Sequence, residues 1–341
     1  MKDLEKYIAD EIADVSMNRP HVVLLGAGAS RAAFPRGERN GKRLPVMADF
    51  FEIALVADVL ASAGIPCSGR NFEELYSELS NDPAKEKICE SLERAIFEYF
   101  SLLDLPDEPT LYDHLILSLR PKDVIATFNW DPFLIQAARR NGRAGGGIPQ
   151  ILFLHGNVLT AFCERDQLHG LRGARCSRCG QPFIPGKLLF PVADKDYEID
   201  PAIRSAWRTV RGAFENAFMV TIFGYGAPQS DRGAVNLLNE AWGGWQKRKM
   251  EQIEIIDIRE EGELVETWEP FVHSHHYEVY RDFYESWIAN HPRRTGEAFR
   301  SQYIDAQFIE NNPLNKKGNF DELWTWFGPL VAAEARVLGN S

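Results

Sequence analysis

Three apolar runs, each followed by residues suited to a ligand, constrain the fold of this chain most. With the residues that follow them, they occupy positions 21–30, 125–131 and 151–156. Each run is typical of a buried parallel strand. The first is followed by glycines, the second by an amide and a carboxylate, and the third by a histidine. Because open α/β sheets bind ligands beyond the carboxyl ends of their strands, we expect the three endings to line one crevice. A nucleotide site is the first hypothesis.

Composition and charge narrow the class of protein. The 341 residues carry a formal net charge of −11, which argues against a broad surface for DNA or RNA. A glycine-rich loop holds four cationic residues, for which a solvated loop is the simpler interpretation. Long uncharged apolar stretches and a signal-peptide core are both absent from the sequence, and five cysteines suit a reducing compartment. We therefore expect a cytoplasmic protein without a membrane segment. The four cations are Arg36, Arg39, Lys42 and Arg43.

Alternating strand and helix patterns predict an α/β fold: a doubly wound, mostly parallel, Rossmann-like sheet. Residues 36–120 are dominated by helical patterns and predict a helical insertion between the first two strands. A second insertion, at 160–187, is loop-like and holds three cysteines. The expected strands are 22–25, 124–127, 151–154, 188–192, 218–223 and 253–258. The expected helices are 4–15, 47–63, 72–79, 85–103, 110–119, 132–140, 201–215, 233–247 and 321–338.

The glycine turn after the first strand, Gly26-Ala27-Gly28, allows a backbone to approach a pyrophosphate, and free amides there attract the anion. The dehydrogenase form of this turn has a third glycine where this chain has Arg31. It also has an acidic residue about 20 positions later, at the end of a second strand. Asp49 has nearly that spacing but lies in a stretch typical of a helix start. A hydride-transfer fingerprint is therefore absent, and a structural tight turn is the alternative to a phosphate site.

Taken together, these motifs resemble the sirtuin superfamily. Residues 26–30 match its Gly-Ala-Gly-x-Ser pattern, and residues 127–131 match Thr-x-Asn-x-Asp. His155-Gly156 then follows a strand, and Cys176-x-x-Cys179 matches the cysteine knuckle. The match spans about residues 20–260 in the correct order. The resemblance implies NAD as the ligand.

Within the superfamily, residues 31–37, 44–50 and 222–231 resemble the NAD-hydrolysing branch of bacterial anti-phage defence systems. The resemblance implies a sirtuin-like NAD-binding domain over 1–260 and a C-terminal extension over 261–341 that provides packing or partner contacts. It implies an NAD glycohydrolase that releases nicotinamide and ADP-ribose and depletes NAD in abortive infection. It also implies a homo-oligomer and a defence partner, such as a translocase-type ATPase or a nucleic-acid sensor. The alternatives are an NAD-dependent protein-lysine deacylase and a non-catalytic NAD- or ADP-ribose-binding sensor.

The chemistry assigns roles to three polar residues. Cleavage of the nicotinamide–ribose bond passes through an oxocarbenium-like sugar, so the protein must hold the ribose, place water and accept a proton. His155 is the candidate base, or it orients ribose hydroxyls. Asn129 can hold water or a ribose hydroxyl, and Asp131 either pairs with the carboxamide or caps the next helix. Asp257 is expected at the adenine-side ribose, although a solvated strand-end carboxylate is the alternative. The full set that the resemblance implies for cofactor binding is Gly26, Ala27, Gly28, Ser30, Phe34, Thr127, Gly224 and Asp257.

The cysteine insertion suits a structural zinc ion. Cys176 and Cys179 have the spacing of a zinc knuckle, and Cys163 is available as a third ligand. We predict His169 as the fourth ligand, with Asp166 as the alternative. Four protein ligands would close the site to substrate. A relic loop without metal is the other possibility.

Overall fold

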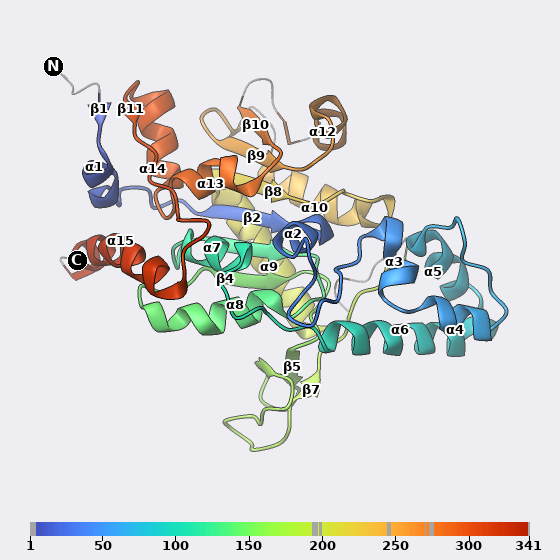
Figure 1. Ribbon diagram of the computed structural model, residues 1–341. Helices are drawn as coiled ribbons and strands as arrows, with labels where there is room; N and C mark the ends of the chain where they lie inside the picture. The colour runs from blue at the N-terminus through green and yellow to red at the C-terminus, as the bar shows by residue number, and fades with distance from the viewer. Residues whose placement is uncertain are drawn as a thin grey trace.

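The computed structural model describes residues 5–192, 197, 200–243, 247–269, 271–272 and 276–339. Its centre is a six-stranded sheet whose neighbouring strands are all parallel (Figure 1). The chain begins in the middle at β2, adds β3 and β4 on one side, and returns to add β8, β9 and β10 on the other. This is the Rossmann strand order, which confirms the predicted fold class. In spatial order the strands are β10 (Tyr277–Tyr280), β9 (Gln252–Ile256), β8 (Met219–Phe223), β2 (His21–Leu25), β3 (Val124–Thr127) and β4 (Gln150–Phe153).

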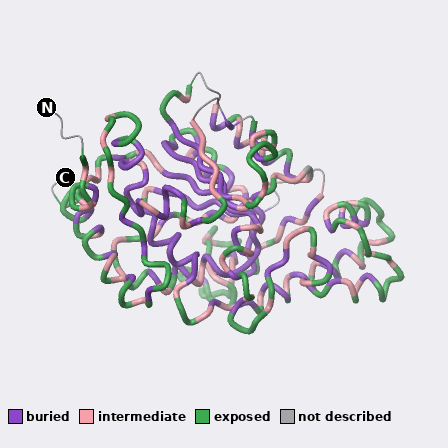
Figure 2. Tube along the Cα trace, turned by 45° about the horizontal axis from the view of Figure 1, so that its top comes forward, coloured by how far each residue is buried: buried purple, intermediate pink, exposed green. Residues whose placement is uncertain are grey.

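Both faces of the sheet are buried, because successive side chains of a strand point to opposite faces. In β2, Val23 and Leu25 belong to one hydrophobic core, and Val22 and Leu24 belong to the other. Figure 2 shows the buried residues concentrated along the sheet and the exposed ones at the periphery. The first core includes residues of α2 (Ala27–Ala33), α7 (Leu111–Leu117), α8 (Phe133–Asn141) and α13 (Trp287–Asn290), and the second includes residues of α9 (Pro201–Asn216), α10 (Arg232–Trp242) and α12 (Glu261–Trp268).

Helices fill the chain between β2 and β3, where none of the described residues forms a strand. Figure 1 shows α3 to α6 extending to one side of the sheet. The single helix predicted over 47–63 is wrong. It is broken at Leu55, whose φ of +57° is left-handed and ends a right-handed helix. The elements are α3 (Phe50–Ile53), α4 (Ala57–Ser62), α5 (Phe72–Ser80) and α6 (Glu86–Ser101).

The cysteine insertion is more regular than the expected loop. It forms a three-stranded antiparallel sheet that projects from the body as a finger (Figure 1). The strand predicted at 188–192 is absent. Its Phe190 ring instead packs on Tyr76 and Trp130, and this stretch pairs with no strand of the described chain. The finger strands are β5 (Thr160–Cys163), β6 (Leu168–Leu171) and β7 (Ile184–Pro185).

The two ends of the chain pack together, which shortens the predicted first helix. β1 (Glu5–Lys6) pairs with β11 (Phe308–Ile309), so that α1 covers only Ile8–Ala13 rather than 4–15. The helix predicted over 233–247 ends at Trp242, and residues 244–246 lie outside the described part. The last helices are α14 (Thr295–Phe299) and α15 (Phe320–Gly339).

Residues after 260 belong to the main sheet and to its hydrophobic cores as well as to the periphery of the molecule. β10 continues the main sheet, and Trp268 and Ile288 are core residues. Two buried arginines, Arg293 and Arg294, pair with Glu334 of α15 and attach that helix to the body. The expected boundary between residues 1–260 and 261–341 therefore separates β10 from the rest of the sheet. In the described part of the chain, we find no helix with the length and apolarity required to cross a bilayer.

Glu254, in the middle of β9, provides a test of the buried sheet. The Thr221 hydroxyl donates to its Oε1 at 2.9 Å and the Trp287 N–H to its Oε2 at 2.6 Å. Burial nevertheless raises the pKa of Glu254 to about 7 from the ordinary 4.5. The folded state then keeps a proton that the unfolded state releases near pH 4.5, so stability falls as the pH rises from about 4.5 to 7.

We expect Glu254→Gln to remove this dependence. The unfolding free energy of the variant minus that of the unmodified protein should rise by about 3 kcal/mol as the pH rises from 5 to 8. Denaturant unfolding at both pH values measures the difference. Glu98→Gln, at an exposed position of α6, is the matched control and should show no gain. Equal pH dependence of Glu254→Gln and the unmodified protein would contradict the account.

Candidate active site

A cleft of about 1380 Å³ opens at the carboxyl edge of the sheet. It lies where the strand order reverses between β2 and β8, which is where open α/β sheets bind ligands. Gly26, Asn129 and His155, which follow β2, β3 and β4, all line it. Gly224 and Asp257, which follow β8 and β9, line it as well. The endings of the three apolar runs thus share one crevice.

The three predicted glycines hold two loops against each other. The Gly26 N–H donates to the Phe223 carbonyl at 3.0 Å, and the Gly28 N–H donates to the Gly224 carbonyl at 2.9 Å. A Cβ on Gly26 would lie 2.5 Å from the Gly224 oxygen, and one on Gly28 would lie 2.8 Å from the Gly224 Cα. Our expectation of free amides in this turn needs correction. The Gly28 amide is engaged by Gly224, and the Ala29 amide donates to the Gly26 carbonyl at 3.0 Å.

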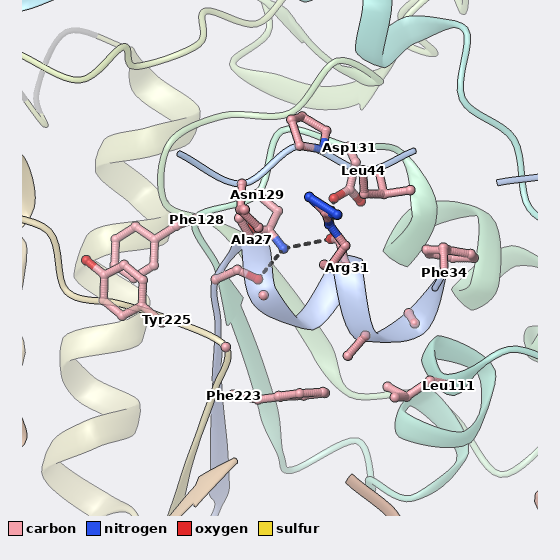
Figure 3. A pocket seen from close by; sticks show the side chains of 18 of the residues that line it. Ala27, Arg31, Phe34, Leu44, Leu111, Phe128, Asn129, Asp131, Phe223 and Tyr225 are labelled. Atoms are coloured by element: carbon pink, nitrogen blue, oxygen red, sulfur yellow. Dashed lines mark hydrogen bonds between the residues drawn. The ribbon is translucent and has the colours of Figure 1, made fainter. Parts of the chain in front are cut away.

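Asn129 is fixed by its amide nitrogen. Nδ2 donates to the Gly26 carbonyl at 2.8 Å and to the Ser30 hydroxyl at 2.9 Å (Figure 3). Its backbone N–H donates to Thr127 Oγ1 at 3.0 Å. Because both hydrogens of Nδ2 have acceptors, Oδ1 is the group that Asn129 can offer to water or a ribose hydroxyl. Thr127 is fully buried and does not line the cleft, so it acts on the site through Asn129.

Asp131 lines the cleft but is buried and internally bonded. The Ser30 hydroxyl donates to Oδ2 at 2.6 Å, and the Phe133 N–H donates to Oδ1 at 3.3 Å. The Ser30 oxygen also lies 2.7 Å from the Tyr112 hydroxyl. Burial raises the pKa of Asp131 to about 6. The carboxyl therefore serves the start of α8, as one sequence alternative had it, and also faces the cleft.

His155 lies beside a carboxylate that the sequence reasoning missed. Its Nε2 is 3.6 Å from Oδ1 of Asp231, and both side chains are buried. The Tyr225 hydroxyl donates to the Asp231 Oδ2 at 2.8 Å. The Phe128 ring makes an edge contact with His155 and stacks on Tyr225, with centroids 4.8 Å and 4.1 Å apart (Figure 3 shows the stacked pair). Asp231 lies seven residues after the predicted Gly224. Its position after β8 is the sequence feature that could have identified it as a site residue.

The remaining predicted residues Phe34 and Asp257 also line the cleft. Phe34 lines it at the end of α2 and packs on Phe133, with centroids 4.2 Å apart. Asp257 lines it after β9, where Arg259 holds both carboxylate oxygens at 3.2 and 3.0 Å. The Asp257 carboxylate is therefore an ion-pair partner rather than a solvated group.

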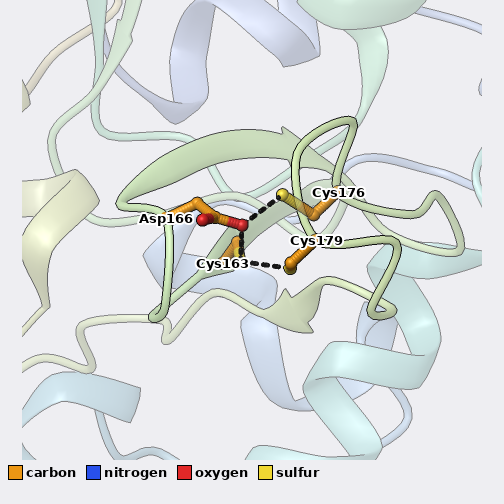
Figure 4. Close-up of side chains that lie close together, drawn as sticks. All are labelled: Cys163, Asp166, Cys176 and Cys179. Atoms are coloured by element: carbon orange, nitrogen blue, oxygen red, sulfur yellow. Dashed lines mark hydrogen bonds between the residues drawn. The ribbon is translucent and has the colours of Figure 1, made fainter.

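Four side chains of the finger form a possible metal-binding site. The ligand atoms of Cys163, Asp166, Cys176 and Cys179 all lie within 4.8 Å of one another (Figure 4). The two sulfurs of Cys163 and Cys179 are 3.6 Å apart, and Asp166 Oδ2 accepts from Cys176 at 3.1 Å. Zinc bonds of about 2.3 Å to sulfur and 2.0 Å to oxygen would place tetrahedral ligand atoms about 3.5–3.8 Å apart. The cluster can therefore hold a structural zinc ion.

The fourth ligand was predicted wrongly. His169 is exposed and packs on Phe162, and it is not part of the cluster. In the antiparallel register Phe162 is opposite His169, and Cys163 is opposite Leu168. Because successive residues of a strand point to opposite faces, His169 lies on the face away from Cys163. Asp166, in the turn between β5 and β6, takes the fourth place.

Of the comparisons with known proteins, the one with solved structures found matches. No protein-family model and no curated protein matches the chain. A Sir2 homologue–NAD complex is 15% identical, covering 88% of this chain and 92% of that one, with a TM-score of 0.38. A Sir2–p53 peptide–NAD+ structure is 16% identical, covering 86% and 95%, with a TM-score of 0.33. A structure from work on the mechanism and regulation of Sir2 enzymes is 12% identical, covering 97% of each chain, with a TM-score of 0.37.

The contact between the two glycine loops is testable by adding a methyl group. Gly224 has φ +58°, and a Cβ there would lie 2.3 Å from the Ala29 nitrogen. We expect Gly224→Ala to lower the unfolding free energy by about 2–5 kcal/mol. Gly226→Ala, two residues later in open space, is the control and should stay within about 0.5 kcal/mol. Denaturant unfolding measures both, and equal stabilities would show that the loops are not packed as described.

Zinc content tests the finger. We expect about one zinc ion per chain by elemental analysis, and chelation should lower the melting temperature. Cys176→Ser should abolish stoichiometric zinc, and Asp166→Ala should weaken binding at least tenfold. His169→Ala is the control and should keep its zinc, because this residue faces away from the cluster. Loss of zinc in the control with retention in Asp166→Ala would reverse the assignment.

Proposed function

We propose that this chain is an NAD glycohydrolase. The observation that carries the proposal is that His155, Asp231 and Asn129 line one switch-point cleft beside the paired glycine loops, with His155 and Asp231 3.6 Å apart. The resemblance of residues 31–37, 44–50 and 222–231 to NAD-hydrolysing sequences supports it. The reaction converts NAD+ and water to nicotinamide, ADP-ribose and a proton.

The residues of the cleft suit each requirement of this reaction. As the bond from the ribose C1′ to the ring nitrogen breaks, its electron pair neutralises the pyridinium, so nicotinamide needs no acid to leave. Water adds to C1′, and its proton passes to His155. The Asp231 carboxylate orients the imidazole and stabilises its cationic form, as carboxylates do beside catalytic histidines. Asn129 Oδ1 accepts from the water or a ribose hydroxyl.

The other assignments complete this proposal. Asp131 faces the cleft and can accept from the carboxamide of nicotinamide. The zinc-binding finger is structural, because the four protein ligands leave no open position. The resemblance supports a cytoplasmic, NAD-depleting role in anti-phage defence, a homo-oligomer, and a partner such as a translocase-type ATPase or nucleic-acid sensor. These cellular assignments rest on the resemblance alone.

Removal of the imidazole should stop turnover. We expect His155→Ala to lower kcat for NAD about 10²–10⁴-fold without unfolding the protein, because a general base contributes about that much. Asp231→Asn should lower it about 10–10²-fold, since the imidazole remains but loses its partner. A time course of NAD loss and nicotinamide release measures both. His169→Ala, a histidine lost from the exposed finger, is the matched control with full activity.

The same assay separates the alternatives. NAD alone should be consumed, with ADP-ribose as the product. Nicotinamide release that requires an acyl-lysine peptide would overturn the proposal in favour of a deacylase. Binding of NAD without turnover, in the purified chain and in cells that express it, would identify a sensor module. His155→Ala with more than about a tenth of the activity would remove the assigned base.

A further inference from the structure

The paired glycine loops raise a question about charge. If the cleft binds a dinucleotide, as proposed above, the two negative charges of the diphosphate need donors near the turn after β2. The Gly28 and Ala29 amides are already bonded to Gly224 and Gly26. The helix that follows, α2, has only seven residues and contributes a short dipole. A cationic side chain near the turn would add to the donors that this anion needs.

Arg31 occupies the right place on α2. It follows Ala27 by four residues and Gly28 by three, so all three lie on one face of the helix. Side chains of a helix lean toward its N-terminus, which directs Arg31 back toward the turn. Arg31 lines the cleft, and its side chain is 29% exposed. Figure 3 shows it leaving α2 on the side where Asn129 and Leu44 lie.

One nitrogen of the Arg31 guanidinium is hydrogen-bonded, and the group has further N–H donors. Its Nη2 donates to Oδ2 of Asp49, and Asp49 is itself fixed by the Val46 N–H at 2.9 Å. The Nε of Arg31 is buried and has no hydrogen-bond partner among the described residues. A second guanidinium, that of Arg43, lies 3.9 Å from the same Asp49 oxygen. Two cations therefore lie near this one carboxylate.

Of the four other cations that line the cleft, three are paired with carboxylates. Three of them follow β9 or β10 or belong to the C-terminal segment, and each has a carboxylate partner. Arg36 is exposed in the loop after α2. The three pairs are Arg259 with Asp257, Arg281 with Glu260 and Lys316 with Asp282.

We infer that Arg31 binds the diphosphate of the dinucleotide and that Asp49 holds its guanidinium in position. This also explains the departure from the dehydrogenase pattern. There, a glycine at this position allows close packing of helix and strand, and the turn amides hold the pyrophosphate. Here the Gly28 amide serves the contact with Gly224, and an arginine stands in place of the third glycine and supplies further donors.

Calorimetry with two ligands tests the assignment without relying on turnover. ADP-ribose carries the diphosphate and adenosine does not. We expect Arg31→Gln to weaken ADP-ribose binding about 10–100-fold and to leave adenosine binding unchanged. Arg31→Lys should recover part of the loss. Arg39→Gln removes a charge from the loop after α2, outside the cleft, and should bind both ligands normally.

Each contrary outcome has a distinct meaning. Unchanged ADP-ribose binding in Arg31→Gln, or an equal loss for adenosine, would overturn the role of Arg31 and leave the proposed hydrolase intact. A wild-type chain that binds no ADP-ribose would overturn both. If Arg31→Gln does not fold, the salt dependence of the wild type decides: affinity for ADP-ribose should fall with salt, and that for adenosine should not. An affinity for ADP-ribose that salt does not change would overturn the assignment.

Discussion

The backbone of the loop after β2 lies directly against the backbone of the loop after β8, with no side chain between them. Glycine at positions 26, 28 and 224 makes this approach possible, and two hydrogen bonds across it, from Gly26 to Phe223 and from Gly28 to Gly224, hold it. These are the two strands between which the strand order reverses. The contact therefore lies in the lining of the cleft and fixes the two loops on either side of the switch point.

Two sets of polar contacts lie beside this contact between the glycine loops. On one side Asn129 bonds the Gly26 carbonyl and Ser30, which ties the loop after β3 to the start of α2. On the other side His155 Nε2 lies 3.6 Å from Oδ1 of Asp231, so the end of β4 is close to the loop after β8. The bonds of Asn129 thus fix two neighbouring loops to each other before any ligand arrives. Such preorganisation is what stabilisation of a developing oxocarbenium ion requires.

The sequence was sufficient for the parts of this structure that depend on local patterns. Apolar runs located β2, β3 and β4, and their endings located the crevice, because parallel strands end at one edge. Residues chosen by tertiary contact were not predictable in this way. Asp231 is near His155 only through the order of the strands, in which β2 and β3 separate β8 from β4, and Asp166 replaces His169 only because of the register of β5 and β6. Residues 188–192 have the composition of a strand but pair with no strand of the described chain, and the Phe190 ring packs on Tyr76 of α5 and on Trp130 in the loop after β3.

The central claim is that the cleft between β2 and β8 is a dinucleotide site whose reactive end lies between Asn129 and His155. A crystal structure of the chain with ADP-ribose tests it most directly. The account predicts the diphosphate over residues 26–31, with the nicotinamide-side ribose beside the amide of Asn129 and the imidazole of His155. Density for the ligand elsewhere on the molecule, or a ribose out of reach of both side chains, would contradict it.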